Sequence, residues 1–161
     1  MSAQTQTSSQ PNLGMQVTTF ENPMGINGFE FVEFAAPAGE GARMRDYLEK
    51  LGFTAVAKHR ERAITLFRQG TINFLLNEQP DSFASDFAAK HGPSACGFAI
   101  RFRKKPAEVL EHVLASGGEE MEHLAATRAV DFPVIKGIGD CMLYLIDDSS
   151  DDVYADYEPL P

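Results

Sequence analysis

The chain has 161 residues, a formal net charge of −9 and a pI near 4.8. This length fits one compact domain, and a hydrophobic content of 43% is enough for a core. The acidic balance argues against nucleic acid as a partner, because binding to phosphates depends on Lys and Arg. No apolar run approaches the roughly 20 residues of a membrane helix, and the polar start of the chain has no signal-peptide pattern. We therefore expect a cytoplasmic protein with no membrane contact.

The first part of the chain predicts a tail followed by one mixed unit. Residues 1–22 are rich in Ser, Thr, Gln and Asn and predict a disordered tail. A strand is expected at 28–34 and a helix near 40–51. That helix has one apolar face, formed by Met44, Tyr47, Leu48 and Leu51. Three short strands complete a β-α-β-β-β unit, at 53–58, 64–68 and 72–76.

The same order of elements then recurs. After a connecting helix at about 81–91, a strand is expected at 97–102, a helix at 106–116, and strands at 134–136 and 142–146. The chain also aligns with itself, residues 64–78 over 134–148 at an offset of about 70, and Gly28 over Gly97. We therefore predict a single domain at 23–157 with two βαβββ modules, at about 26–79 and 95–148.

Paired modules of this kind resemble the vicinal oxygen chelate, or glyoxalase-like, architecture, an α+β fold with pseudo-two-fold symmetry. A ferredoxin-like arrangement is the main rival.

Three segments carry a more specific resemblance. They are Asn22-Pro23-Met24-Gly25 with residues 28–35, residues 84–99, and residues 133–139 with 143–147, supported by Arg68-Gln69-Gly70 and Ile72-Asn73. Over about residues 22–157 they resemble the first half of bacterial 4-hydroxyphenylpyruvate dioxygenases. This implies an Fe(II)-dependent enzyme of tyrosine catabolism that converts 4-hydroxyphenylpyruvate and O2 to homogentisate and CO2. Hydroxymandelate synthase, with the same fold and substrate, stays open as an alternative.

The resemblance also implies where the iron lies. In that family the second domain holds it with two His and one Glu, so this chain is expected to be the scaffold and oligomerisation half. Its expected partners are the C-terminal iron-binding domain and further copies of itself.

Metal-binding members of the architecture place ligands on the first and last strand of each module. The matching positions here are Gly28, Phe74, Gly97 and Tyr144. Gly and Phe offer no donor atom, and Tyr is an uncommon iron ligand. We therefore expect no catalytic, cofactor-binding or metal-binding residue in this chain, and no activity from it alone.

Four histidines could suggest other metal sites, but none is favoured. His59 is predicted to be solvated in a charged loop, His91 to support a turn, and His112 to lie on a helix surface. His123 stands among Glu119, Glu120 and Glu122, which predicts at most weak cation binding. No two histidines have the i, i+4 spacing of a helical metal site.

Other motifs favour structural roles. Glu30 and Glu33 are three residues apart on a strand, so they are predicted to point to opposite faces and not to act as a pair. Residues 136–139 predict a turn between strands and not a phosphate loop. Cys96 and Cys141 lie in apolar runs and are predicted to be buried free thiols.

Two other functions stay open. The chain could be a stand-alone dioxygenase or isomerase whose ligands lie elsewhere, which metal analysis would show. It could also be a metal-free binding module whose Phe-lined cup takes a small aromatic ligand, which a ligand titration would show.

Overall fold

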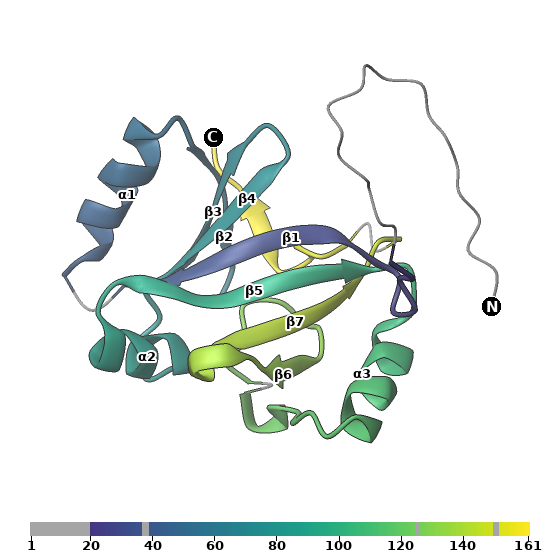
Figure 1. Ribbon diagram of the computed structural model, residues 1–161. Helices are drawn as coiled ribbons and strands as arrows, with labels where there is room; N and C mark the ends of the chain where they lie inside the picture. Colours follow the sequence, from purple (N-terminus) through teal and green to yellow (C-terminus); the bar gives the residue numbers. More distant parts are fainter. Residues whose placement is uncertain (1–19, 37–38, 125, 150–151) are drawn as a thin grey trace, which may run out of the picture.

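The computed structural model describes residues 20–36, 39–124, 126–149 and 152–161. Every predicted helix and strand occurs (Figure 1), with bounds that shift by a few residues. The elements are β1 (Ile26–Ala35), α1 (Gly41–Lys50), β2 (Thr54–His59), β3 (Ile64–Gln69), β4 (Ile72–Asn77), α2 (Phe83–His91), β5 (Ser94–Phe102), α3 (Pro106–Ala115), β6 (Val134–Lys136), β7 (Met142–Asp147) and β8 (Tyr157–Pro159). Most of the predicted tail, residues 1–19, lies outside the described residues.

The eight strands of the described residues form one sheet, in the order β6-β7-β5-β1-β4-β3-β2-β8. Within the first module β1 runs parallel to β4, and within the second β5 runs parallel to β7. The two modules meet where β1 and β5 pair antiparallel at the centre, with Phe31 opposite Ala99. The first strands of the two modules thus hold equivalent places, and the predicted pseudo-two-fold α+β fold is confirmed.

The second module is the less regular of the two. Among the described residues, the second module is one strand short of the predicted βαβββ order: where the first module has β2, the second has an isolated bridge between Glu120 and Ile135. The stretch from α3 to β6 instead contains a short 3-10 helix, Glu122–Leu124, and turns. This part of the chain is therefore free to fold over the sheet and does not extend it.

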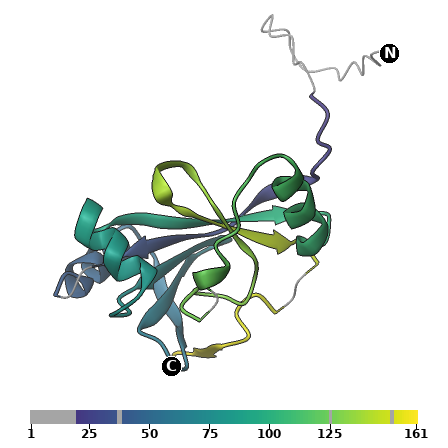
Figure 2. The same cartoon turned by 90° about the horizontal axis from the view of Figure 1, so that it is seen from below.

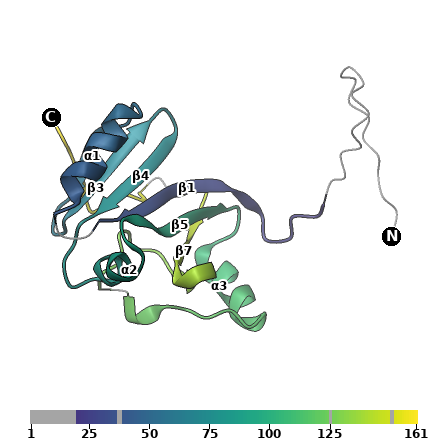
Figure 3. The same ribbon diagram turned by 60° about the vertical axis from the view of Figure 1, so that its left-hand side comes forward.

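Helices α1 and α3 pack on one face of the sheet, which we call the outer face. Figure 3 shows α1 beside β3 and β4. Under α1 lie Leu48, Phe67 and Leu76, and under α3 lie Val109 and Leu145. Because successive strand residues point to opposite faces, the neighbours of these strand residues belong to the other side. Each helix therefore buries its own small cluster on the outer face.

The opposite, inner face carries the largest hydrophobic cluster, which includes Phe31, Leu75 and Tyr144. Helix α2 and two further segments close it: residues 126–133, and the C-terminal segment, which we define as residues 152–160 and which contains β8. Viewed from below, the C-terminal segment runs across the molecule to β8 (Figure 2). The inner face is thus covered by the chain itself.

The apolar face predicted for α1 is half right. Leu48 is 4% exposed and Met44 packs beside it, whereas Tyr47 and Leu51 are exposed. We predict that Leu48→Ala lowers the free energy of unfolding by about 2–5 kcal/mol, the usual range for a buried Leu. The matched control Leu51→Ala should change it by less than about 0.5 kcal/mol. Urea denaturation measures both, and equal effects would show that the orientation of α1 is wrong.

Candidate functional site on the inner face of the sheet

A buried polar group lies at the centre of the inner face, where β1, β4, β5 and β7 come together. The side chains of Glu33 and Tyr144 are fully buried, and Asn77 is 2% exposed. Tyr144 donates its hydroxyl hydrogen to Glu33 Oε2 at 2.8 Å, and Asn77 Nδ2 donates to Glu33 Oε1 at 2.6 Å. Both oxygens of this carboxyl group therefore have partners, as the burial of a polar group requires.

The same tyrosine anchors the segments that close the inner face. The backbone N–H of Ala129 donates to Tyr144 Oη at 3.0 Å. Tyr157, in the C-terminal segment, donates from its hydroxyl to the Ala129 carbonyl at 3.1 Å. A continuous set of hydrogen bonds thus runs from β4 through Glu33 and Tyr144 to the covering segments.

Gly97 on β5 leaves the space that this arrangement needs. A Cβ atom at this position would lie 3.2 Å from Glu33 Oε2, 3.3 Å from Tyr144 Cε2 and 3.4 Å from Met142 Cε. The glycine lets the carboxyl group and the phenol ring pack against the backbone of the central strand. The sequence prediction explained this glycine by the absence of a ligand, whereas the structure shows a packing role for it.

The surroundings of the group raise the pKa of both of its acidic side chains. Burial raises the pKa of Glu33, and the hydrogen bonds from Asn77 and Tyr144 only partly oppose that effect. Burial, together with the neighbouring Glu33, raises the pKa of Tyr144 well above its usual value. All three side chains are buried among the described residues, and their hydrogen bonds join β1, β4 and β7, which gives the group a role in stability.

These pKa shifts predict a pH dependence of stability. The unfolded chain loses the Glu33 proton near pH 4.3, whereas the folded chain holds it to higher pH because its pKa is raised. The contribution of Glu33 to the free energy of unfolding is therefore complete below that pH. It is lost as the pH rises through the pKa of Glu33 in the folded chain. We expect the stability of the native protein relative to Glu33→Gln to fall from pH 4 to pH 8. Urea midpoints at several pH values measure this, and a constant difference would contradict it.

A second carboxylate on β1 also faces inward. Glu30 Oε1 accepts hydrogen bonds from Tyr154 Oη at 3.0 Å and from Asn73 Nδ2 at 3.3 Å. The prediction that Glu30 and Glu33 point to opposite faces is therefore wrong. The pairing of β1 with β5 shifts by one residue between Phe29 and Phe31, and such a bulge reverses the alternation of side chains. The two carboxylates have separate sets of partners, so they still do not act as a pair.

The four positions matched to metal ligands do not come together. Gly97 and Tyr144 are neighbours on the inner face. Phe74 instead stacks on Phe53 in the cluster under α1, with ring centroids 4.4 Å apart. Gly28 is exposed, and a Cβ there would meet no atom of the described residues within 4 Å. Phe74 lies on the outer face and Tyr144 on the inner face, so the offset of 70 that paired them in the alignment of the chain with itself is wrong by one residue. Leu75 lies on the inner face and is the better counterpart of Tyr144.

The histidines are dispersed, and one of them was mispredicted. His59 is 3% exposed and not solvated: its Nδ1 accepts from the Glu61 N–H at 3.1 Å, and its ring packs edge-on against Tyr157. Burial lowers the pKa of this imidazole. His91, His112 and His123 are exposed. Among the described residues, no three His, Cys, Asp or Glu side chains are grouped as a metal site requires.

Cys96 and Cys141 are buried free thiols, as predicted. Burial raises the pKa of both, which opposes thiolate chemistry. In the described part of the chain, no helix has the length and apolar character needed to span a bilayer.

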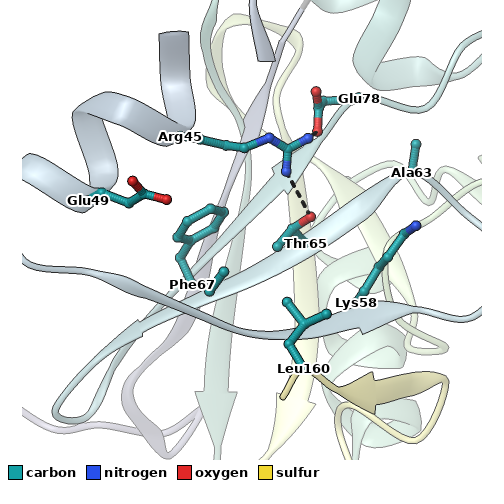
Figure 4. Close-up of a pocket in the computed structure, with 9 residues that line it drawn as sticks. Arg45, Glu49, Lys58, Ala63, Thr65, Phe67, Glu78 and Leu160 are labelled. Carbon is teal, nitrogen blue, oxygen red and sulfur yellow. Dashed lines mark hydrogen bonds and ion pairs between the residues drawn. The ribbon is translucent and has the colours of Figure 1, made fainter. Parts of the chain in front are cut away.

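A surface hollow lies beside α1, away from the inner face. It has a volume of about 500 Å³. Figure 4 shows Arg45 reaching from α1 to Glu78 and to Thr65, whose Oγ1 lies 3.4 Å from Arg45 Nη1. Lys58 and Glu49 also line it, so the two positive charges are balanced by two negative ones. The charges of the residues that line this hollow therefore balance.

Two mixed modules joined through antiparallel β1 and β5, with a cupped inner face, define the vicinal oxygen chelate class of fold. The family described as "Hydroxyphenylpyruvate dioxygenase, HPPD, N-terminal" matches residues 20–158. The chain belongs to this family.

Individual relatives agree with this assignment. A 4-hydroxyphenylpyruvate dioxygenase of Pseudomonas sp. (strain P.J. 874) is 44% identical over 128 residues, which cover 80% of this chain and 35% of that protein. A 3-dehydroshikimate dehydratase of Pseudomonas aeruginosa is 37% identical over 121 residues, 75% of this chain and 19% of that protein.

Among solved structures, a xylose isomerase-like TIM barrel/4-hydroxyphenylpyruvate dioxygenase fusion protein matches with a TM-score of 0.75 and 33% identity, over 84% of this chain and 21% of that one. The chain thus spans about a third or less of the length of these proteins.

Proposed function

We propose that this chain is the non-catalytic N-terminal half of an Fe(II)-dependent 4-hydroxyphenylpyruvate dioxygenase. The complete enzyme converts 4-hydroxyphenylpyruvate and O2 to homogentisate and CO2, with its iron held outside this chain. The observation that carries the proposal is the closed inner face, where Glu33, Asn77 and Tyr144 satisfy one another. In a metal-binding module, that place would have to offer free donor atoms and open coordination positions.

The described residues do not fit an iron ion. Iron of this class needs two imidazoles and a carboxylate that converge on one point. Here the exposed His91, His112 and His123 lie on α2, on α3 and in the stretch between α3 and β6, and His59 is packed against Tyr157. The chain's contribution to the enzyme is therefore shape: a rigid sheet on which the iron-binding part folds and, as we propose, through which copies associate in the cytoplasm.

The dioxygenase is favoured over the dehydratase as the complete protein because the match is closer, 44% identity against 37%. The metal-free binding module imagined from the sequence is not favoured in its original form. The Phe-lined cup that it requires is filled by Tyr144, Tyr157 and Val153 of the same chain.

A domain exchange tests the proposal. In the Pseudomonas sp. dioxygenase, the 128 residues that match are replaced by the corresponding residues of this chain. Iron content and homogentisate formation are then measured for the chimera, for this chain alone and for the relative without its matching region. We expect iron and turnover in the chimera and neither in the chain alone. Stoichiometric iron with homogentisate formation by this chain alone would overturn the proposal, and so would an inactive but folded chimera.

A further inference from the structure

His59 lies at the point where the C-terminal segment joins the sheet. It ends β2 and stands opposite Tyr157, the first residue of β8, in the ladder between these two strands. The rings of His59 and Tyr157 pack edge-on, with their centroids 5.1 Å apart. Tyr157 in turn donates its hydroxyl hydrogen to the Ala129 carbonyl, so the pair connects β2 to both of the chain segments that close the inner face. A titratable side chain therefore occupies the contact that holds the C-terminal segment in place.

The hydrogen bond of this imidazole requires a neutral ring. The backbone N–H of Glu61 can only donate, and it donates to His59 Nδ1 at 3.1 Å. Nδ1 therefore carries no hydrogen, and the ring hydrogen is on Nε2. A proton added to Nδ1 would turn this acceptor into a donor and bring two N–H groups against each other. Because the ring is buried, water cannot solvate the charge while His59 stays in this position.

The charges around the ring do not compensate for a bound proton. Four charged side chains face it, from the loop that follows β2 and from the C-terminal segment: Arg60, Glu61, Arg62 and Asp156. The two arginines oppose the two carboxylates, and among the described residues no carboxylate forms an ion pair with His59. In the same part of the chain, His59 Nε2 has no hydrogen-bond acceptor. A protonated His59 is therefore stabilised mainly by moving its ring into water.

We propose that His59 is an acid-sensitive switch: when it takes up a proton, its ring leaves Tyr157, the C-terminal segment separates from β2, and the inner face of the sheet opens. Val153 and Tyr157 belong to the cluster on that face, so their departure uncovers it. This switch is a property of the chain itself and does not depend on the scaffold function proposed above.

Linkage gives the direction of the effect. An imidazole exposed by opening has a pKa near 6.5, whereas burial lowers the pKa of His59 in the closed state. The open state therefore binds the proton at a higher pH than the closed state does. The contribution of His59 to closure is complete above about pH 6.5 and is lost as the pH falls below that value.

Two amides report directly on the contact between β2 and the C-terminal segment. The Arg60 N–H donates to the Asp156 carbonyl and the Leu160 N–H to the Val56 carbonyl, both at 2.9 Å. Their hydrogen exchange is followed by NMR in the full chain at pH 7.5 and at pH 5.0, and each rate is corrected for the intrinsic effect of pH. Since an exposed imidazole can favour opening by up to about tenfold per pH unit below 6.5, we expect both protection factors to fall by about tenfold or more. Amides in the ladder between β1 and β5 should change much less.

A variant that cannot titrate separates His59 from other acid effects. His59→Phe keeps an aromatic ring beside Tyr157 but takes up no proton, so the two reporter amides should have equal protection at both pH values. The matched control is His112→Phe, at an exposed histidine on α3, which should respond to pH as the native chain does.

The ring ¹⁵N chemical shifts of His59 in the native chain give a measurement that does not depend on the folding of any variant. They should show the hydrogen on Nε2 at pH 7.5, and the titration of the ring should coincide with the loss of protection of the two reporter amides. The proposal is overturned if that protection is the same at both pH values, if its loss persists in His59→Phe, if the ladder between β1 and β5 loses protection equally, or if Nδ1 carries the hydrogen at pH 7.5.

Discussion

Replacing Tyr144 by alanine is expected to lower the free energy of unfolding by about 3–5 kcal/mol, the range for removal of a buried aromatic side chain. The ring lies at the centre of the largest cluster and packs against Phe31, with ring centroids 5.2 Å apart. Its hydroxyl also joins Glu33 to Ala129, so alanine leaves both groups buried without that partner. Since domains of this size are commonly stable by about 5–15 kcal/mol, much of the stability should be lost.

The variant Tyr144→Phe separates the hydroxyl from the ring. It keeps the packing but removes one hydrogen bond to Glu33 and one from Ala129, which should cost about 1–3 kcal/mol. Urea unfolding followed by far-UV circular dichroism measures both variants. If the two variants lose the same amount, the ring contributes little and our placement of the core on the inner face is wrong. If Tyr144→Phe loses nothing, the hydrogen bonds described above do not form.

The order of elements could be predicted from the sequence because it depends on local patterns. Met44 and Leu48, four residues apart, have the spacing of one helix face and so predict α1. Gly70 predicts the turn between β3 and β4, and its φ of 57° is one that glycine adopts readily. The repeat of the pattern then indicated that β1 and β5 hold equivalent places in two modules, whereas the pairing of these two strands with each other was seen only in the structure. The short strand β8 was missed, because Tyr157-Glu158-Pro159 has no alternating pattern of its own. It forms only because β2 offers a free edge.

The inner face was harder to predict, because it depends on register. A single bulge before Phe31 turns Glu30 inward, beside Tyr154, although the spacing from Glu33 predicts the opposite face. A difference of one residue between β4 and β7 likewise placed Phe74 where Leu75 belongs. Because side chains alternate with a period of two, an error of one residue reverses the face. Sequence spacing alone does not reveal such shifts.

His59 shows a second limit of prediction from the sequence, which concerns burial. Its neighbours Lys58, Arg60 and Glu61 are exposed, so the local composition predicts a solvated side chain. The ring is nevertheless buried, because Tyr157, almost a hundred residues later, packs edge-on against it. Burial of a single polar residue by a distant segment leaves no local signal. The only clue was Tyr157 itself, a large aromatic residue near the end of the described chain.

Gly97, the position matched to a metal ligand on β5, lies on the closed inner face and has no room for a larger side chain. From the sequence, Gly97 could have been a metal-ligand position from which the side chain had simply been lost. In the structure its place is occupied by Glu33, Tyr144 and Met142, which all lie within 3.4 Å of an added Cβ. A ligand restored here would therefore compete with the core of the domain. Whether a side chain at position 97 binds a metal or disturbs the core can be measured.

We predict that Gly97→His destabilises the chain and does not create a metal site. The Cβ alone is close to three buried side chains, and the imidazole adds five ring atoms in a central strand held by β1 and β7 on either side. Overpacking of this kind costs about 1–3 kcal/mol, and displacing Glu33 from its partners adds about 1–3 kcal/mol. Gly97→Ala, as the control, should cost only about 1 kcal/mol.

Urea midpoints are measured anaerobically with and without Fe(II), because a metal that binds the folded state raises the midpoint. We expect the midpoint of Gly97→His to be low and unchanged by Fe(II). Native-like stability, with a midpoint that rises on addition of Fe(II), would mean that the inner face is an open metal cup and that its closure by Tyr144 and the C-terminal segment is wrong.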